Sequence, residues 1–449
     1  MYNHLLHSTI FALCCLPLLL GTVRAETEPC SVATVEDYAG WAWKSWVIKN
    51  GLITLAVVPE IGGRVMQYDL DGHPSIYLNP AEIGKTYSPS EHSGWPNYGG
   101  YKTWPAPQNR WLVGGGGWPP PPNLDFGTYS CQIVTDTPES SSVKLESPVE
   151  ILSKYACQGL KFERQLTIYR GSTRVKVEQT LVNTGSQRVN WSIWDVTQSI
   201  VNHPGETDYD NFWVYFPVRA DSEFGKAGYY VMSGDKDDPQ WKSDIALGVS
   251  AVQYLHHGGK IGADSDGGWI CYVDRKDGYA YAKRFAYFKE GTYPDNGASV
   301  EVYTSPGLPY LEVEVLSPLV DLAPEESYTF VEDWYAARCE GPILEVNNAG
   351  VIRKRITVET LQDSIRVNGI YGVFYQGEIK VVFKNVNEEE IIDSGKSYPV
   401  SPSVQFLLDD NCSMPQETRQ VELQLCDALG KFVGTLDSNL ISEQRGKDK

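Results

Sequence analysis

The chain has 449 residues, with 38 Lys and Arg against 57 Asp and Glu, so its formal net charge is −19 at pH 7. This acidic balance argues against nucleic acid and anionic membranes as partners, because both repel a negatively charged protein. The length exceeds that of one typical domain and predicts one large and one small domain.

Residues 1–25 resemble a secretory signal peptide. An apolar run from Ile10 to Leu20 is followed by the small-residue cleavage pattern Val23-Arg24-Ala25. The run is too short to span a bilayer in the mature protein, and no later segment is apolar enough for a membrane. We therefore expect a mature chain that begins at Glu26 and is secreted or periplasmic.

Seven cysteines follow the predicted signal peptide. Export permits disulfides, and the pairs Cys131–Cys157 and Cys412–Cys426 are both plausible. Sequence alone does not establish their connectivity, and the odd number leaves one cysteine over. No Cys/His spacing is typical of zinc, and no Walker or dinucleotide-binding motif occurs, so we expect neither a metal nor a cofactor.

Strand patterns dominate the chain up to about residue 340. The runs 161–169, 173–183 and 189–201 largely alternate polar and apolar side chains and are joined by short polar turns, which predicts a three-stranded antiparallel meander. Residues 269–274 and 279–285 predict a further hairpin. A long all-β segment of this kind closes as a sandwich or barrel.

The tryptophan-rich segment precedes the predicted meander. Between Trp95 and Trp118 the chain packs four of its thirteen tryptophans, and residues 114–122 read GGGGWPPPP. Neither a helix nor a central strand accommodates that run, so we expect one long ordered loop. Indoles beside Lys102 and Gln108 suit a sugar ring. The alternative is that the indoles plug the end of a sheet.

Two strands carry polar groups that could perform chemistry. Glu312 and Glu314 share one face of the strand 310–318, which is either solvated or the floor of a cleft. In the run 189–201, Asp195 shares a face with Thr197, and Trp194 shares one with Gln198.

Other candidates lie in or near loops. Arg284 and Asp295 could clamp a substrate hydroxyl or carboxylate, although an exposed ion pair is the simpler interpretation. His92 and His203 could act as general acids near neutral pH, although a single histidine is more often structural.

The small domain is predicted over residues 351–440, after a large domain over residues 26–340. Its short strands and polar turns favour a small β-sandwich similar to an immunoglobulin domain.

Several motifs together resemble the galactose mutarotase-like superfamily and, within it, the exported proteins grouped as DUF4380. The resemblance implies a β-supersandwich whose concave face binds a mono- or polysaccharide. It runs through roughly residues 45–340 and rests on the motifs VPEIGGR (58–64), YGGYKTWPAPQ (98–108), SIWDVTQ (192–198), YPDNG (293–297) and EVEVLSP (312–318).

The resemblance also implies roles for individual residues. In aldose 1-epimerases of this fold a late-strand glutamate is the base, which corresponds to Glu314. The segment expected to supply the acidic histidine, around Asp195, contains none, so the acid is expected to be Asp195 itself or a nearby histidine such as His203. The expected substrate-binding residues are Lys102, Trp104, Gln108, Trp194, Gln198, Arg284 and Asp295.

Two other functions remain open. The missing histidine favours a non-catalytic sugar-binding module. A polysaccharide lyase would instead use Arg284 and Lys102 to hold a uronate carboxylate. The fold does not decide among these, because one fold hosts many activities.

Overall fold

The computed structural model describes residues 27–92, 94–203, 205, 210–361, 364–387, 390–415 and 417–441. The predicted signal peptide lies outside these residues. In the part of the chain that is described, no helix has the length and apolar character needed to cross a membrane. Among the described residues, the helices are the α-helical turns α1 (Pro122–Asp125) and α2 (Pro294–Gly297) and four 3₁₀ turns, Tyr38–Gly40, Pro59–Ile61, Gln108–Arg110 and Gly225–Ala227.

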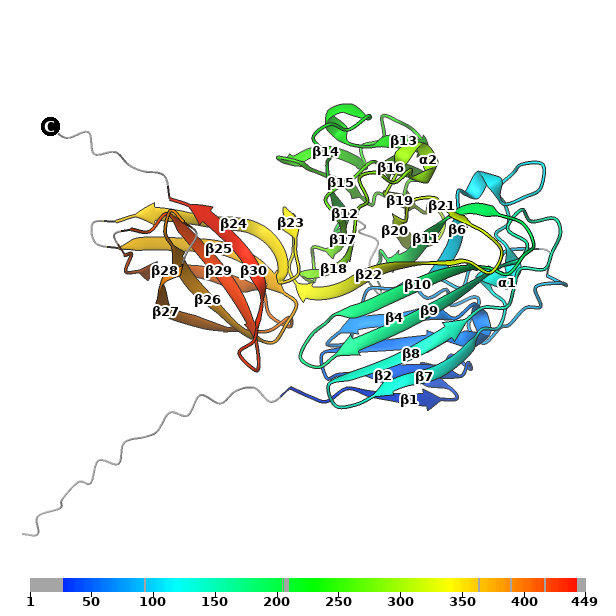
Figure 1. The fold of residues 1–449 in the computed structure, drawn as a ribbon, viewed down its shortest axis with the longest axis horizontal. Helices are drawn as coiled ribbons and strands as arrows, with labels where there is room; N and C mark the ends of the chain where they lie inside the picture. Colours follow the sequence, from blue (N-terminus) through cyan, green and yellow to red (C-terminus); the bar gives the residue numbers. More distant parts are fainter. Residues whose placement is uncertain are drawn as a thin grey trace, which may run out of the picture.

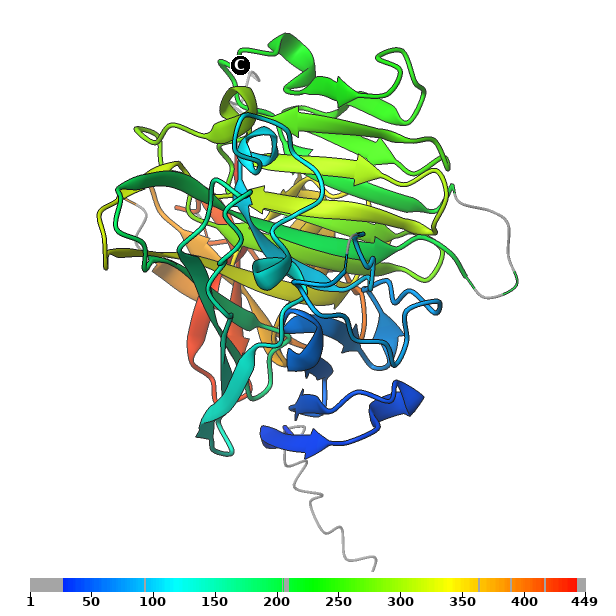
Figure 2. The same cartoon turned by 90° about the vertical axis from the view of Figure 1, so that its right-hand side faces the viewer.

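The first large sheet has twelve strands (Figure 2). In spatial order they are β1 (Ser31–Val35), β2 (Ser45–Lys49), β3 (Ile53–Val58), β4 (Arg64–Leu70), β6 (Tyr101–Ala106), β11 (Val189–Ile200), β20 (Tyr310–Leu316), β19 (Val300–Thr304), β16 (Gly259–Ala263) and β13 (Tyr230–Ser233), with β5 (His73–Pro74) on β4 and β21 (Val320–Leu322) on β11.

The second large sheet has ten strands (Figure 1). Their order is β14 (Trp241–Ala246), β15 (Val249–Gln253), β12 (Phe212–Pro217), β17 (Trp269–Asp274), β18 (Tyr279–Phe285), β22 (Ser327–Arg338), β10 (Val175–Asn183), β9 (Leu160–Tyr169), β8 (Ser140–Glu146) and β7 (Ser130–Asp136).

The two large sheets pack through one apolar core. Aromatic contacts join them directly: Tyr68 of β4 lies with its ring centroid 5.4 Å from that of Tyr281 on β18, and Tyr101 of β6 lies 4.6 Å from Trp334 on β22. Burial of this apolar surface is the main stabilising contribution to the fold. The arrangement confirms the predicted all-β supersandwich.

The predicted meander is only half correct. β9 pairs with β10 as expected, but β22 rather than β11 lies on the other side of β10. β11 crosses to the twelve-stranded sheet, where it lies between β6 and β20. Its side chains are buried on both faces from Trp191 to Ser199, as a central strand requires, whereas β9 and β10 alternate between buried and half-buried positions.

The prediction of one continuous loop around the tryptophans is wrong for residues 101–106. These residues form β6, which pairs with β11 along its length but with β4 only at Tyr101. Pro105 therefore lies where one side of the strand has no ladder partner, and its missing N–H costs no sheet hydrogen bond. The segment that follows, up to α1, is irregular as expected.

Residues beyond 340 form two four-stranded sheets that share their own apolar core (Figure 1). This confirms the small C-terminal sandwich, while the boundary between residues 340 and 351 stays a prediction. The sheets are β23 (Glu345–Val346), β24 (Gly350–Thr360), β25 (Ile365–Val373) and β28 (Phe406–Cys412), and β27 (Glu390–Val400), β26 (Gly377–Lys384), β29 (Gln420–Asp427) and β30 (Phe432–Leu440).

Neither plausible disulfide forms. Cys412 and Cys426 belong to different sheets of the small sandwich. Cys131 lies on the edge strand β7, separated by β8 from β9, which Cys157 precedes. Closeness in sequence therefore does not bring either pair together.

Candidate functional site

One face of the twelve-stranded sheet carries a band of charged and polar side chains across five adjacent strands, called the charged band below. The register places Lys102 opposite Val196, Gln198 opposite Glu312, and Glu314 opposite Glu301. Directly opposed residues share a face of the sheet. The band therefore runs from β6 through β11, β20 and β19 to β16.

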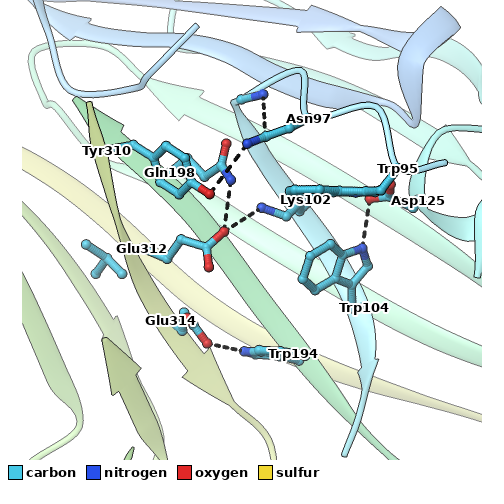
Figure 3. A network of polar contacts seen from close by, with 12 residues as sticks. Trp95, Asn97, Lys102, Trp104, Asp125, Trp194, Gln198, Tyr310, Glu312 and Glu314 are labelled. Atoms are coloured by element: carbon cyan, nitrogen blue, oxygen red, sulfur yellow. Dashed lines mark hydrogen bonds and ion pairs between the residues drawn. The ribbon is translucent and has the colours of Figure 1, made fainter. Parts of the chain in front are cut away.

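The first half of this band centres on Glu312 (Figure 3). Its Oε1 accepts hydrogen bonds from Lys102 Nζ and from Gln198 Nε2, both at 3.0 Å. Burial lowers the pKa of Lys102, and Glu312 partly offsets this effect. The Lys102 ammonium also lies 4.7 Å from the ring centroid of Trp104, a favourable cation–π distance. The Glu312 side chain is 11 % exposed, so solvent reaches this cluster.

The second half centres on Lys260 of β16. Its Nζ lies 2.6 Å from Glu301 Oε2 and 2.8 Å from Glu314 Oε2. Trp194 Nε1 donates to the same Glu314 oxygen at 2.8 Å (Figure 3). The other oxygen, Glu314 Oε1, is buried without a hydrogen-bond partner among the described residues. One ammonium thus serves two buried carboxyl groups.

Burial perturbs the pKa of both acids, and the shared ammonium offsets only part of this effect. Burial raises the pKa of Glu301 well above its ordinary value, Lys260 opposes the rise, and the charge of Glu314 adds to it. Burial also raises the pKa of Glu314, again against Lys260. Two carboxyls this close to one cation favour a state in which one is ionised and the other keeps its proton. Such a pair offers one group that can accept a proton and one that can donate it.

The tryptophan-rich segment forms a wall beside this face (Figure 3). Asp125 of α1 accepts hydrogen bonds from Trp95 Nε1 and Trp104 Nε1, both at 2.8 Å, and Arg64 Nη2 lies 2.6 Å from it. Because Asp125 is buried, these contacts hold the indoles in fixed orientations.

The indoles themselves divide between the two expected roles. Trp111 is fully buried and packs 5.3 Å from Trp104, centroid to centroid, as the plug hypothesis requires. Trp118 is 50 % exposed and lies edge-on to Trp95 at 5.0 Å, as a ligand-binding surface would require.

Asp195 and His203, predicted as acids, do not reach Glu314. Asp195 pairs with Val315 and therefore lies on the opposite face of β11, buried between the sheets in an ion pair with Lys283. His203, beyond the end of β11, faces Asp274 at 2.7 Å.

The predicted binding residues do not all lie at one place in the structure. Lys102, Trp104, Trp194 and Gln198 lie at the charged band, as described above. Arg284 does not, because β18 belongs to the ten-stranded sheet, where Arg284 pairs with Trp269. The Gln108 amide donates to the Gly117 carbonyl at 3.0 Å and thereby shapes the loop. Asp295 lies near enough to the band for the charge of Lys260 to act on it. Burial raises the pKa of Asp295, and Lys260 opposes this rise.

Sequence reasoning missed Glu301 and Lys260. A signal for Glu301 was present, because residues 300–304 alternate and are followed after a short loop by β20, which predicts antiparallel pairing. Lys260 had no such signal, since β16 is brought to β19 only by the sheet order.

Comparison with known proteins identifies the chain with a family. Residues 45–337 match the model of DUF4380, a domain of unknown function. This match confirms the resemblance inferred from the sequence. Among curated proteins, none matches the chain.

Solved structures with a similar fold include three with names that refer to mutarotases. A galactose mutarotase-like protein from Clostridium acetobutylicum has 12 % identity and a TM-score of 0.44, covering 70 % of this chain and 99 % of that one. A galactose mutarotase related enzyme from Lactobacillus acidophilus has 10 % identity and a TM-score of 0.42, covering 68 % and 99 %. A galactose mutarotase-like protein from Lactobacillus casei has 10 % identity and a TM-score of 0.43, covering 65 % and 99 %. Similarity at this level carries no argument about function.

Proposed function

We propose that this chain, which belongs to the DUF4380 family, binds a sugar at the charged face of its twelve-stranded sheet and moves protons on that sugar through Glu301 and Glu314. The observation that carries the proposal is the pair of buried carboxyls that share Lys260. General acid–base catalysis needs one group that holds a proton and one that accepts it near the working pH.

The reaction we favour is epimerisation at the anomeric carbon. The ionised carboxylate takes the proton of the anomeric hydroxyl while the protonated carboxyl gives its proton to the ring oxygen. The ring C–O bond breaks, the new carbonyl rotates, and the reverse proton transfers close the ring with the opposite configuration. No proton is gained or lost overall, and no redox partner is needed.

The rest of the band suits recognition of a sugar. Glu312, Gln198 and Lys102 present acceptors and donors that are already ordered by mutual hydrogen bonds. Trp95 and Trp118 supply an apolar surface beside them. Sugar sites combine these two features, with few polar groups fixing orientation and aromatic rings covering the ring faces.

A non-catalytic sugar-binding module is the second candidate. It is favoured by the complete burial of Glu314, one oxygen of which is already bonded to Trp194 and Lys260. The pair of residues named for a lyase is not supported, because Arg284 and Lys102 lie on different sheets.

The proposal is tested by measuring binding and turnover separately. Sugars that raise the melting temperature are identified first, and their mutarotation is then followed by polarimetry. We expect Glu314→Gln and Glu301→Gln to lower the catalysed rate at least 100-fold while sugar affinity changes less than tenfold. Glu178→Gln on β10 is the matched control and should leave both unchanged.

Two outcomes decide between the candidates. If the wild type binds a sugar but mutarotation proceeds as in buffer, the epimerase is refuted and the binding module stands. If no mono- or oligosaccharide shifts the melting temperature, both are wrong.

Export of the chain also remains part of the proposal. It is supported by the pattern of residues 1–25. The intact mass of the protein recovered from the producing cells should correspond to a chain that starts at Glu26. Retention of residues 1–25 would contradict export by this route.

A further inference from the structure

A second cluster of polar side chains lies where the two large sheets meet, away from the charged band. His73 of β5 and His203, which follows β11, come from the twelve-stranded sheet. Asp274 ends β17, and Asp277 lies in the turn between β17 and β18 of the ten-stranded sheet. None of these four residues contributes to the proposed sugar chemistry.

The ligand atoms of His73, Asp274 and Asp277 lie close to one another, and His203 approaches the two carboxylates. His73 Nε2 lies 3.4 Å from Asp274 Oδ2 and 3.2 Å from Asp277 Oδ2. His203 Nε2 lies 2.7 Å and 3.6 Å from the same two oxygens. The atoms of His73, Asp274 and Asp277 all lie within 4.8 Å of one another. Around a tetrahedral zinc ion, with ligands at about 2.0–2.2 Å, neighbouring ligand atoms are roughly 3.3 Å apart.

The neighbours of these side chains fix their orientation. Asp274 Oδ1 accepts the backbone N–H groups of Lys276 and Asp277, which leaves Oδ2 directed at the histidines. The ring of His73 stacks on Tyr279 at 4.2 Å between centroids. The backbone donors to Asp274 are outer partners of the kind that orient carboxylate ligands in known metal sites.

From this geometry we infer a binding site for a divalent transition-metal ion, zinc foremost, formed by His73, His203, Asp274 and Asp277. Two imidazoles and two carboxylates match the ligands that zinc accepts, and a site of mixed nitrogen and oxygen donors selects it over calcium or magnesium. The sequence alone predicted no metal, because its ligands lie on three separate segments without a recognisable spacing.

The bound ion would cross-link the two sheets. Each sheet supplies two ligands, so the ion would add a link between side chains that already meet through their ion pairs and through the stacking of His73 on Tyr279. Since the metal binds the folded chain, occupancy raises the unfolding temperature. The alternative is a metal-free cluster held by the contacts between the histidines and the two aspartates.

The test uses the chain purified in chelator and then dialysed free of it. Titration with zinc chloride, followed by calorimetry and elemental analysis, should give one equivalent bound per chain and a higher melting temperature. Cobalt(II) added in place of zinc should produce the intense visible absorption of four-coordinate cobalt.

Two variants at different positions test the ligands, so the result does not depend on one substitution that could impair folding. We expect His203→Ala and Asp277→Asn each to weaken zinc binding at least tenfold and to abolish the zinc-induced rise in melting temperature. His257→Ala is the matched control, because His257 faces one carboxylate, Asp238, at 2.9 Å on the surface. Absence of zinc binding by the wild type, or equal binding by wild type and both ligand variants, would overturn the inference.

Discussion

Replacement of Glu301 by Gln tests whether the buried acid pair holds a proton in the folded protein. Burial raises the pKa of Glu301, so between the unfolded value of about 4.3 and the raised folded value the native state keeps a proton that the unfolded chain releases. Stability contributed by this group is therefore present at low pH and lost as pH rises through the folded pKa. The loss approaches about 1.4 kcal/mol per pH unit for one retained proton.

The glutamine variant keeps the shape of the side chain but binds no proton. Glu314 then has Lys260 to itself, and its own pKa should fall. From about pH 5 to about pH 7 the variant should therefore gain stability relative to the wild type as the pH rises. Urea unfolding, followed by tryptophan fluorescence at several pH values in this window, measures the difference.

The same measurement on Glu178→Gln provides the control. Glu178 lies on β10 of the other sheet, paired with Lys176, so its pH profile should run parallel to that of the wild type. If the Glu301→Gln profile is also parallel between about pH 5 and 7, Glu301 is ionised in the native state. The proposed division of roles between the two carboxyls would then be wrong.

Two substitutions and one chemical reaction test three other parts of the structure. Trp194→Phe removes the indole donor to Glu314 and should cost about 1.5–3 kcal/mol in urea unfolding; a loss below about 0.5 kcal/mol would mean that this hydrogen bond is not made. Asp195→Asn leaves Lys283 buried beside a neutral partner and should lower the free energy of unfolding by roughly 3 kcal/mol, while sugar affinity stays unchanged. A change in sugar affinity at full stability would show that Asp195 belongs to the binding site. In the native protein Cys131 should be the first thiol to react with an alkylating reagent. The reaction should be slow, because burial raises the pKa of Cys131 to about 12. Rapid reaction near neutral pH would contradict this environment.

Alternation of side chains along single strands was predictable from the sequence. Asp195 and Trp194 were assigned to opposite faces of β11, and the structure confirms that assignment. What the alternation does not show is which face points outward. In a central strand both faces are buried, and polar residues on either one look alike in sequence. The sequence for this reason predicts Asp195 beside Glu314, whereas in the structure Asp195 lies between the sheets.

Pairing between strands was predictable only over short connections. The β9–β10 and β17–β18 hairpins follow from tight turns. The turn after β10 is equally short, yet the chain crosses there to the other sheet. The position of Arg284, on the sheet opposite to Lys102, depends on this same long-range topology. Residue types alone do not encode it, because many non-local pairings bury similar surfaces.

β11 connects the two sites that the structure suggests. Gln198 binds Glu312 at the charged band, and the backbone N–H of Ile200 donates to Ser75 O, two residues beyond His73. His203 follows three residues later. The end of β11 is therefore bonded to the segment that carries His73 and leads directly to His203, both ligands of the inferred zinc site. If zinc orders this end, its removal should weaken sugar binding through Gln198 without any change at Glu301. Equal sugar affinity with and without zinc would show that the two sites are independent.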